Sequence, residues 1–210
     1  MAMDKAQTWV YAEQYAPERD AIAQARAAAL DLGANPISTG VGATLRMLAA
    51  LSRARAVLEI GTGAGISGLW VLDGMSPDGV LTTIDHEIEF QRAARHAFAN
   101  AGIASQRTRL IAGRALDVLP RMAARAYDMV VIDADVAETP EYLDHALRVL
   151  RPAGVVAMVH AMWFDKVADP AQRDSETVMM REAVRVLSET RNFVPCLLPV
   201  GDGLAVAVRA

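Results

Sequence analysis

Glycines that directly follow an apolar run are the residues of this sequence with the clearest chemical meaning. The run 57–60 leads into Gly61, Gly63 and Gly65, and a helical pattern follows at once. Glycine adopts positive φ angles and lacks the Cβ that would keep a ligand away from the backbone. The free N–H groups at the start of the next helix point at the same place. The segment therefore predicts the ligand-binding turn of a doubly wound sheet.

The residues around the glycines narrow the choice of ligand. A dinucleotide fingerprint needs glycine or alanine at the sixth position of G-x-G-x-x-G, where this sequence has Ile66, and Glu59 before the glycines is also foreign to it. A second apolar run, 80–84, ends in Asp85, about 20 residues beyond Gly65. A carboxylate at that place can accept hydrogen bonds from both hydroxyls of a ribose. Together these features predict an adenosine ligand other than a dinucleotide.

A pair of carboxylates ends another apolar run. Residues 128–132 lead into Asp133-Ala134-Asp135, at the edge where such sheets bind ligands. Like charges stay close together where a cation compensates them, and a sulfonium or a divalent metal would serve. The alternative is a helix N-cap next to a solvated loop acid.

Composition limits the classes of protein. With 210 residues, 53% of them hydrophobic, the chain is long enough for one domain with its own core. A net charge of −4 and the lack of a basic run argue against nucleic acid as a partner. The single Cys196 excludes an internal disulfide, and the apolar run around it places it in the core. Neither a signal peptide nor a membrane-spanning apolar run is found, so a cytoplasmic protein without a membrane partner is expected.

The apolar runs and the breakers between them predict an α/β fold. Residues 1–52 are expected to be helical and to form a lid or a dimer surface, and residues 53–210 to form the core of the same single domain, 1–210. The short link 200–203 favours an antiparallel hairpin between the last two strands, which closes an otherwise parallel sheet. The predicted strands lie near 56–60, 80–85, 107–112, 128–133, 154–159, 193–199 and 204–209, and the later helices near 65–75, 87–101, 115–125, 140–150 and 174–190.

From about residue 35 to its end, the chain resembles the catechol and caffeoyl-CoA type of O-methyltransferase, family 3. The resemblance implies the Rossmann-like fold of class I methyltransferases, with a seven-stranded, mostly parallel sheet. It also implies the cofactor S-adenosylmethionine (SAM), the product S-adenosylhomocysteine (SAH), a small-molecule hydroxyl as methyl acceptor, and a homodimer. The matching pieces are the loop 59–67, Thr83-Ile84-Asp85, Gly113-Arg114-Ala115, Asp133-Ala134-Asp135, Gly154, Trp163 and 198–203.

The same resemblance implies a set of cofactor-binding residues. Most follow the ends of predicted strands, and the backbone near Ile37 is expected to close over the site. His86, beside Asp85, is expected to line the adenine or to face solvent. The full predicted set is Ile37, Glu59, Gly61, Thr62, Gly63, Ser67, Asp85, His86, Ala115, Asp133 and Asp135.

The metal site of the family is altered in this sequence. The family holds a divalent cation with the first aspartate of the D-A-D triplet, here Asp133, and with an Asp-Asn pair after the fifth strand. Val159 stands in place of that aspartate and His160 in place of the asparagine, and the family's lysine after the triplet is Val136. Magnesium prefers carboxylate oxygens to imidazole, so no bound metal is expected. We expect Asp133 and His160 to be catalytic, with His160 as a general base; the alternative is a neutral histidine hydrogen-bonded at a strand end.

Two other functions stay open at the level of sequence. The first is a SAM-binding or SAH-binding protein without turnover, acting as a regulatory or structural dimer partner. The second is a nicotinamide-dependent oxidoreductase, against which Glu59 and Ile66 argue. Trp163 and Phe164 follow the predicted fifth strand and favour an apolar, aromatic acceptor.

Overall fold

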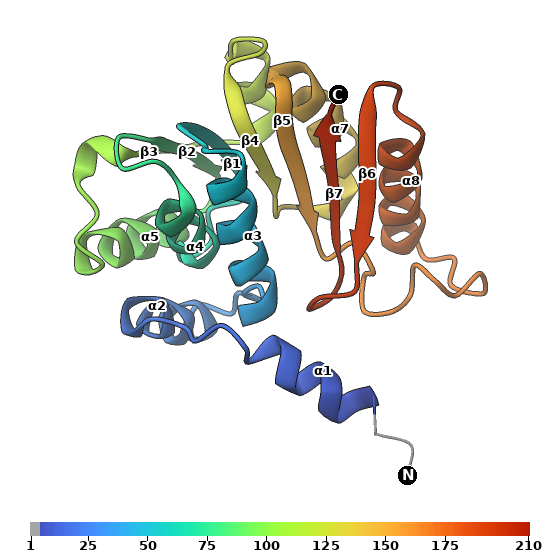
Figure 1. Ribbon diagram of the computed structural model, residues 1–210, viewed down its shortest axis with the longest axis horizontal. Helices are drawn as coiled ribbons and strands as arrows, with labels where there is room; N and C mark the ends of the chain where they lie inside the picture. Colours follow the sequence, from blue (N-terminus) through green and yellow to red (C-terminus); the bar gives the residue numbers. More distant parts are fainter. Residues whose placement is uncertain (1–4) are drawn as a thin grey trace.

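The protein is described by a computed structural model, in which one sheet is covered by helices on both faces (Figure 1). The structure describes residues 5–210, so the first four residues of the predicted domain 1–210 lie outside it. The seven strands are ordered β3-β2-β1-β4-β5-β7-β6, and β7 runs antiparallel to both of its neighbours. The predicted parallel sheet with one reversed strand is therefore confirmed. The strands are β1 (Ala56–Ile60), β2 (Val80–Asp85), β3 (Thr108–Ala112), β4 (Tyr127–Ile132), β5 (Leu150–Val159), β6 (Phe193–Leu198) and β7 (Leu204–Arg209).

The helices divide between the two faces of the sheet. Helices α2 to α5 contribute buried side chains such as Ile22, Leu45, Trp70 and Phe98 to one core cluster. Helices α7 and α8 contribute to the cluster on the opposite face. The helices are α1 (Lys5–Glu13), α2 (Asp20–Asp31), α3 (Thr39–Leu51), α4 (Ile66–Gly74), α5 (Ile88–Asn100), α6 (Ala115–Val118), α7 (Thr139–Val149) and α8 (Ser175–Glu189).

Local chemistry sets where several of these helices begin and end. Ser38 caps α3 by accepting a hydrogen bond from the N–H of Val41, and Asp174 caps α8 in the same way. The helix predicted at 115–125 is short, because a 3₁₀ turn that contains Pro120 follows α6 directly. No described helix is long and apolar enough to cross a membrane.

One sequence prediction about the core is wrong. Cys196 is exposed, although it lies in an apolar run. It belongs to β6, which is the last strand of the sheet and presents most of its residues to solvent. The prediction failed because an apolar run does not distinguish a strand at the edge of a sheet from one at its centre.

Candidate cofactor and methyl-transfer site

A cavity of about 600 Å³ lies at the carboxyl ends of β1, β2 and β4, and the segment 33–37 forms part of its wall. This is the topological switch point, because β1 pairs with β2 on one side and with β4 on the other. Of the predicted cofactor-binding residues, all but Glu59 line this cavity: Ile37, Gly61, Thr62, Gly63, Ser67, Asp85, His86, Ala115, Asp133 and Asp135.

The glycine turn takes its shape from positive φ angles and from one carboxylate. Gly61, Gly63 and Gly65 have φ of 93°, 47° and 89°. The Oδ2 atom of Asp85 accepts hydrogen bonds from the N–H groups of Thr62 and Gly63, at 2.9 and 3.0 Å. A Cβ on Gly61 would collide with the carbonyl oxygen of Asp133, while a Cβ on Gly63 would meet no atom within 4 Å. Glycine at 61 thus permits close packing of two backbones, and Gly63 leaves open space above the turn.

These features fit an adenosine ligand. A carboxylate offers about four acceptor positions. Asp85 uses three of them, the third accepting from the N–H of Glu87 at 2.9 Å. One position is therefore free, and accepting both ribose hydroxyls would require Asp85 to share a backbone bond. His86 also lines the cavity; its side chain is 65% exposed, and its Nε2 atom is 3.2 Å from Oε1 of Glu87.

Glu59 lies beneath the cavity rather than in its wall. Its side chain is fully buried, and its Oε2 atom accepts a hydrogen bond of 2.6 Å from the hydroxyl of Thr83. The Thr83 hydroxyl is 2.7 Å from the Thr62 hydroxyl. The Thr62 hydroxyl in turn accepts a hydrogen bond of 3.1 Å from the side-chain amide of Gln91. Burial raises the pKa of Glu59 to about 8, and its Oε1 atom has no hydrogen-bond partner among residues 5–210. A neutral Glu59 is therefore the end of a buried relay that runs to α5.

Gln91 and Thr83 join the site only in the folded structure. The signal for Thr83 is its place in the strand register, where it lies directly beside Glu59. For Gln91 the signal is its position on the buried face of α5.

His160 lies between two carboxylates that come from different loops. Its Nε2 atom is 3.8 Å from Oδ1 of Asp133, and its Nδ1 atom is 3.2 Å from Oδ2 of Asp202. Desolvation raises the pKa of Asp133 to about 6, against the opposing effect of His160. The other Asp202 oxygen accepts from the N–H of Phe164 at 2.7 Å. A histidine that donates Nδ1–H to Asp202 presents Nε2 as a proton acceptor, which is the arrangement of an oriented general base.

Asp202 is a site residue that the sequence did not single out, although its loop was part of the resemblance. It lies in the turn between β6 and β7. Strand β7 begins at the same edge of the sheet where β5 ends, so this turn lies beside the end of β5. The segment after β5 has an unusual backbone: the φ angles of His160, Trp163 and Phe164 are 54°, 46° and 56°. Such angles are uncommon outside glycine, and they cluster at functional sites.

Two aromatic side chains adjoin His160. The Phe164 ring stacks on the His160 ring at a centroid distance of 6.4 Å and meets Trp163 edge-on at 5.4 Å. Phe164 is 58% exposed. A hollow of about 20 Å³ is lined by Asp133, His160 and Trp163 among others, so these side chains already pack closely.

An apolar side chain lies at the position where the resemblance implies a metal ligand. Val159 is buried and pairs with Leu204 of β7. Val136, in place of the family's lysine, is buried as well. Within residues 5–210, no group of three or more His, Cys, Asp or Glu side chains is arranged to hold a metal ion. The donor set at this place is Asp133 with one imidazole, which does not fit a magnesium ion.

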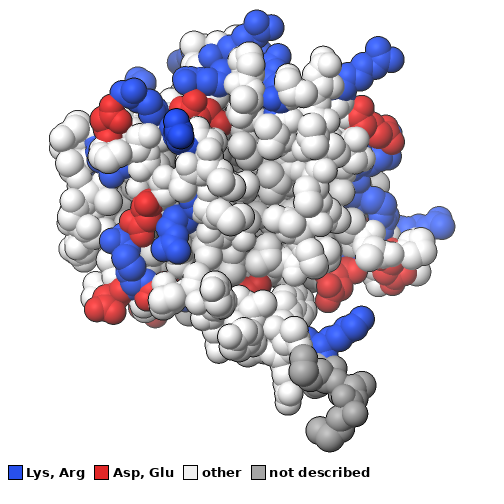
Figure 2. Space-filling model, in the orientation of Figure 1, with Lys and Arg blue, Asp and Glu red and all other residues white. Residues whose placement is uncertain are grey.

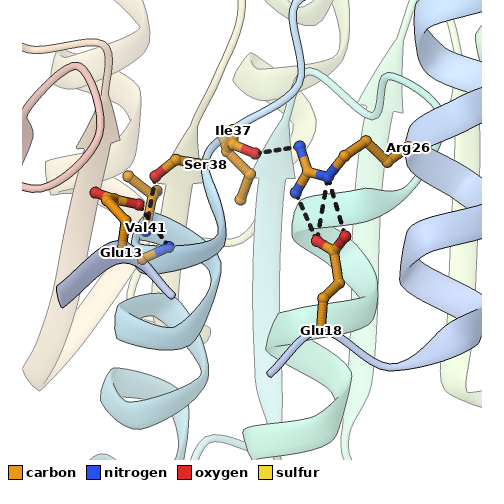
Figure 3. Close-up of polar contacts among 7 residues, drawn as sticks. Glu13, Glu18, Arg26, Ile37, Ser38 and Val41 are labelled. Atoms are coloured by element: carbon orange, nitrogen blue, oxygen red, sulfur yellow. Dashed lines mark hydrogen bonds and ion pairs between the residues drawn. The ribbon is translucent and has the colours of Figure 1, made fainter. Parts of the chain in front are cut away.

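The wall near Ile37 is held by a half-buried arginine of α2 (Figure 3). Arg26 donates to the carbonyl oxygen of Ile37 at 2.7 Å and forms an ion pair with Glu18 at 2.6 Å. The guanidinium thus connects the linker before α2 to the cavity wall. Glu13, at the end of α1, reaches the start of α3 nearby.

Comparison with known proteins agrees with this geometry. A family model described as O-methyltransferase matches residues 13–210. A candidate O-methyltransferase of Mycobacterium avium (strain 104) is 50% identical over 199 residues, which are 95% of this chain and 90% of that protein. The O-methyltransferase TomG of Streptomyces achromogenes, involved in tomaymycin synthesis and solved with SAM, is 30% identical with a TM-score of 0.87, over 99% of this chain and 100% of that one. A protein of Corynebacterium glutamicum has a TM-score of 0.90 at 29% identity, over 98% of this chain and 96% of that one.

Proposed function

This chain belongs to the family of SAM-dependent O-methyltransferases, family 3, and we propose that it methylates a hydroxyl group of a small aromatic molecule without a divalent metal. The observation that supports the proposal is the placing of His160 between Asp133 and Asp202, at the edge of the cofactor cavity. Of these three groups, His160 carries the imidazole, the side chain that most often serves as a general base in enzymes.

Different residues of the cavity contact different parts of the cofactor in this proposal. We propose that Asp85 binds the ribose, and that the backbone of Gly61 to Gly63 lies against the rest of the cofactor. When bound, SAM supplies a methyl group that is already activated by attachment to a positively charged sulfur. The carboxylate of Asp133 lines the same cavity and favours a cation there. Gln91 and Thr83 hold the turn from beneath.

The acceptor hydroxyl is deprotonated by His160 in this proposal. A phenol in water ionises only near pH 10, so proton removal by imidazole must accompany methyl transfer rather than precede it. Asp202 keeps the proton on Nδ1, so that Nε2 can take the proton of the acceptor. The exposed Phe164 ring offers an apolar surface against which an aromatic acceptor can stack.

The absence of a metal requirement is supported by the residues at the metal position. Val159 offers no ligand, and Asp133 is already near an imidazole. Correct positioning of an activated methyl group against a hydroxyl can replace much of what a Lewis acid would contribute.

The experiment that tests the proposal is a turnover assay with SAM and a panel of phenols and aliphatic alcohols of similar size. Mass spectrometry would measure both SAH and the methylated product. We expect a phenol to be methylated and SAH to form in equal amount. Tight binding of SAM or SAH with no product from any acceptor would instead indicate a SAM-binding protein without turnover, and preferred binding of NADH would indicate an oxidoreductase.

We also propose a closed two-fold homodimer in which residues 1–52 provide part of the contact. Helix α1 presents exposed Trp9, Val10 and Tyr11, and the face seen in Figure 2 has few charges over α3, β7 and β6. Exposed apolar side chains on a soluble domain often mark an interface. Light scattering should give twice the mass of one chain at micromolar concentration, and the mass of a single chain would contradict the proposal.

A further inference from the structure

The carboxylate of Glu13 joins two segments that are far apart in the sequence. Its Oε2 atom accepts a hydrogen bond of 2.9 Å from the N–H of Gly40, and its Oε1 atom accepts one of 2.6 Å from the N–H of Gly201. Gly40 lies in the first turn of α3, and Gly201 lies in the turn between β6 and β7. We call this arrangement the Glu13 bridge, and Figure 3 shows the Glu13 side chain next to the start of α3.

Both partners of the bridge are glycines for a steric reason. A Cβ on Gly40 would lie 2.5 Å from Oε2 of Glu13 and 2.8 Å from a methyl carbon of Val200. A Cβ on Gly201 would lie 2.6 Å from the hydroxyl oxygen of Ser38, and Gly201 also has a φ of 53°. A side chain at either glycine would therefore displace the Glu13 carboxylate, Val200 or Ser38 from its present place. The carboxylate therefore occupies a place that both segments are shaped to provide.

The bridge is a polar tie between the end of α1 and the rest of the domain. None of the residues of α1 (Lys5–Glu13) is buried, so apolar packing holds this helix weakly. Hydrogen bonds to an ionised carboxylate are stronger than those between neutral groups, and a negative charge at the N-terminus of α3 also interacts favourably with the helix dipole. The position of α1 and that of the turn 200–203 are thus set by the same side chain.

The turn held by Glu13 contains the partner of the proposed base. Asp202 follows Gly201 directly, and its carboxylate contacts both Nδ1 of His160 and the N–H of Phe164. The backbone of Asp202 and Gly203 also accepts hydrogen bonds from Met162 and Ala161. Movement of this turn would therefore displace His160 and the aromatic segment together.

We propose that Glu13 is a positioning residue for methyl transfer: by fixing the turn 200–203, it places Asp202 so that His160 is held ready to accept a proton. The inference rests on the proposed role of His160 as the base. Glu13 is far from a direct role in chemistry, since it contacts two backbone N–H groups and lines neither the cofactor cavity nor the hollow beside His160.

A second carboxylate near α1 offers a matched comparison. Glu18 acts through Arg26 on the carbonyl of Ile37, which lines the cofactor cavity. Loss of Glu18 should therefore weaken SAM binding and leave kcat nearly unchanged. Loss of Glu13 should lower kcat and leave the KM for SAM nearly unchanged. Both variants remove a carboxylate near the N-terminal end of the domain. Their different effects on the KM for SAM and on kcat therefore distinguish the cofactor cavity from the His160 end of the site.

The test combines kinetics with NMR on the full chain. Glu13→Ala, Glu13→Gln and the adjacent surface control Gln14→Ala would be compared in turnover and in amide spectra. We expect Glu13→Ala to lower kcat by about 10- to 100-fold, the effect of a small misplacement of a reacting group. Glu13→Gln, which keeps one acceptor oxygen, should recover part of that loss, and Gln14→Ala should match the wild type. The amide signals of Gly40 and Gly201 and the ring ¹⁵N signals of His160 should shift in Glu13→Ala.

The double variant Glu13→Ala/His160→Ala distinguishes this proposal from its premise. If Glu13 acts through His160, the double variant should turn over no more slowly than His160→Ala alone. The positioning role would be overturned if Glu13→Ala lowered kcat by the same factor in the His160→Ala background as in the wild type. It would also be overturned if the His160 ring signals did not shift in Glu13→Ala. A full rate in His160→Ala would overturn the base assignment and with it the catalytic part of this proposal, whereas unmoved Gly40 and Gly201 signals in Glu13→Ala would overturn the bridge itself.

Discussion

The floor of the cofactor cavity and the His160 end of the site are built in different ways. The floor consists of backbone N–H groups and glycines from one continuous segment, 61–67, and of Asp85 in the neighbouring strand. The His160 end joins the end of β5, the turn 200–203 and, through Glu13, the helix α1. A local motif can thus define a binding surface, whereas the position of the proposed base depends on contacts between distant segments.

The two regions also differ in how their backbone strain is carried. At the floor the positive φ angles belong to glycines, for which they cost little. At the other end they belong to His160, Trp163 and Phe164, where each costs of the order of 1 kcal/mol or more. Such a conformation persists because surrounding contacts, including those of Asp202, hold it in place. The His160 end should therefore respond more strongly to single substitutions.

The largest expected effect is at His160. His160→Ala should slow methyl transfer by about 10²- to 10⁴-fold, because it removes the proposed base, while SAM affinity should change little. His96→Ala, which alters an exposed histidine on α5, is the control. Steady-state kinetics and calorimetric titration would measure the two quantities. An unchanged rate would show that the acceptor loses its proton without His160.

The next effect is at the floor. Asp85→Ala should weaken SAM binding at least tenfold, equivalent to about 1.4 kcal/mol, because the ribose loses its acceptor and two N–H groups of the glycine turn lose theirs. Titration calorimetry would measure the affinity, with Asp78→Ala as a control that removes a surface carboxylate. A thermal melt would verify that the fold is intact. Equal affinity in the wild type and Asp85→Ala would remove the ribose assignment.

A smaller effect concerns stability and pH at Glu59. Its pKa is raised from 4.5 to about 8, so the folded chain keeps a proton that the unfolded chain loses. The unfolded state then binds fewer protons between these values, and the free energy of unfolding falls as the pH rises through that window. Glu59→Gln removes the titration, so the wild type should lose at least ~1 kcal/mol relative to this variant between pH 5 and pH 8. Urea unfolding at several pH values tests this, and parallel curves for the two proteins would contradict it.

The smallest expected effect is that of metal removal. Because Val159 supplies no ligand beside Asp133, EDTA should leave the rate of methyl transfer unchanged, and millimolar magnesium should add nothing. A magnesium-dependent family member assayed in parallel would show that the chelation works. Activity that is lost in EDTA and restored by magnesium would reject the metal-independent proposal.

The residues that line the floor could be named from the sequence because they are neighbours in the chain or in the sheet register. The strand positions followed from the apolar runs and the reversed β7 from the short link 200–203, whereas the order of the strands in the sheet was not predicted. His160 was identified only through the resemblance, and Asp202 was not identified as its partner, because the contact joins residues 42 apart in sequence. Cys196 was misplaced, since an apolar run does not reveal that a strand lies at the edge of the sheet.

The reversed direction of β7 has a consequence for the order in which the site is completed during synthesis. Because β7 runs against its neighbours, the turn before it lies at the carboxyl edge of the sheet, where the ligand cavity opens. The strands under the cavity, β1, β2 and β4, are already present when residue 135 leaves the ribosome. Asp202 and the contact between Gly201 and Glu13, which spans 188 residues, exist only after the last hairpin has been made. A nascent chain can therefore form the strands under its cavity well before it can hold the proposed proton acceptor in place.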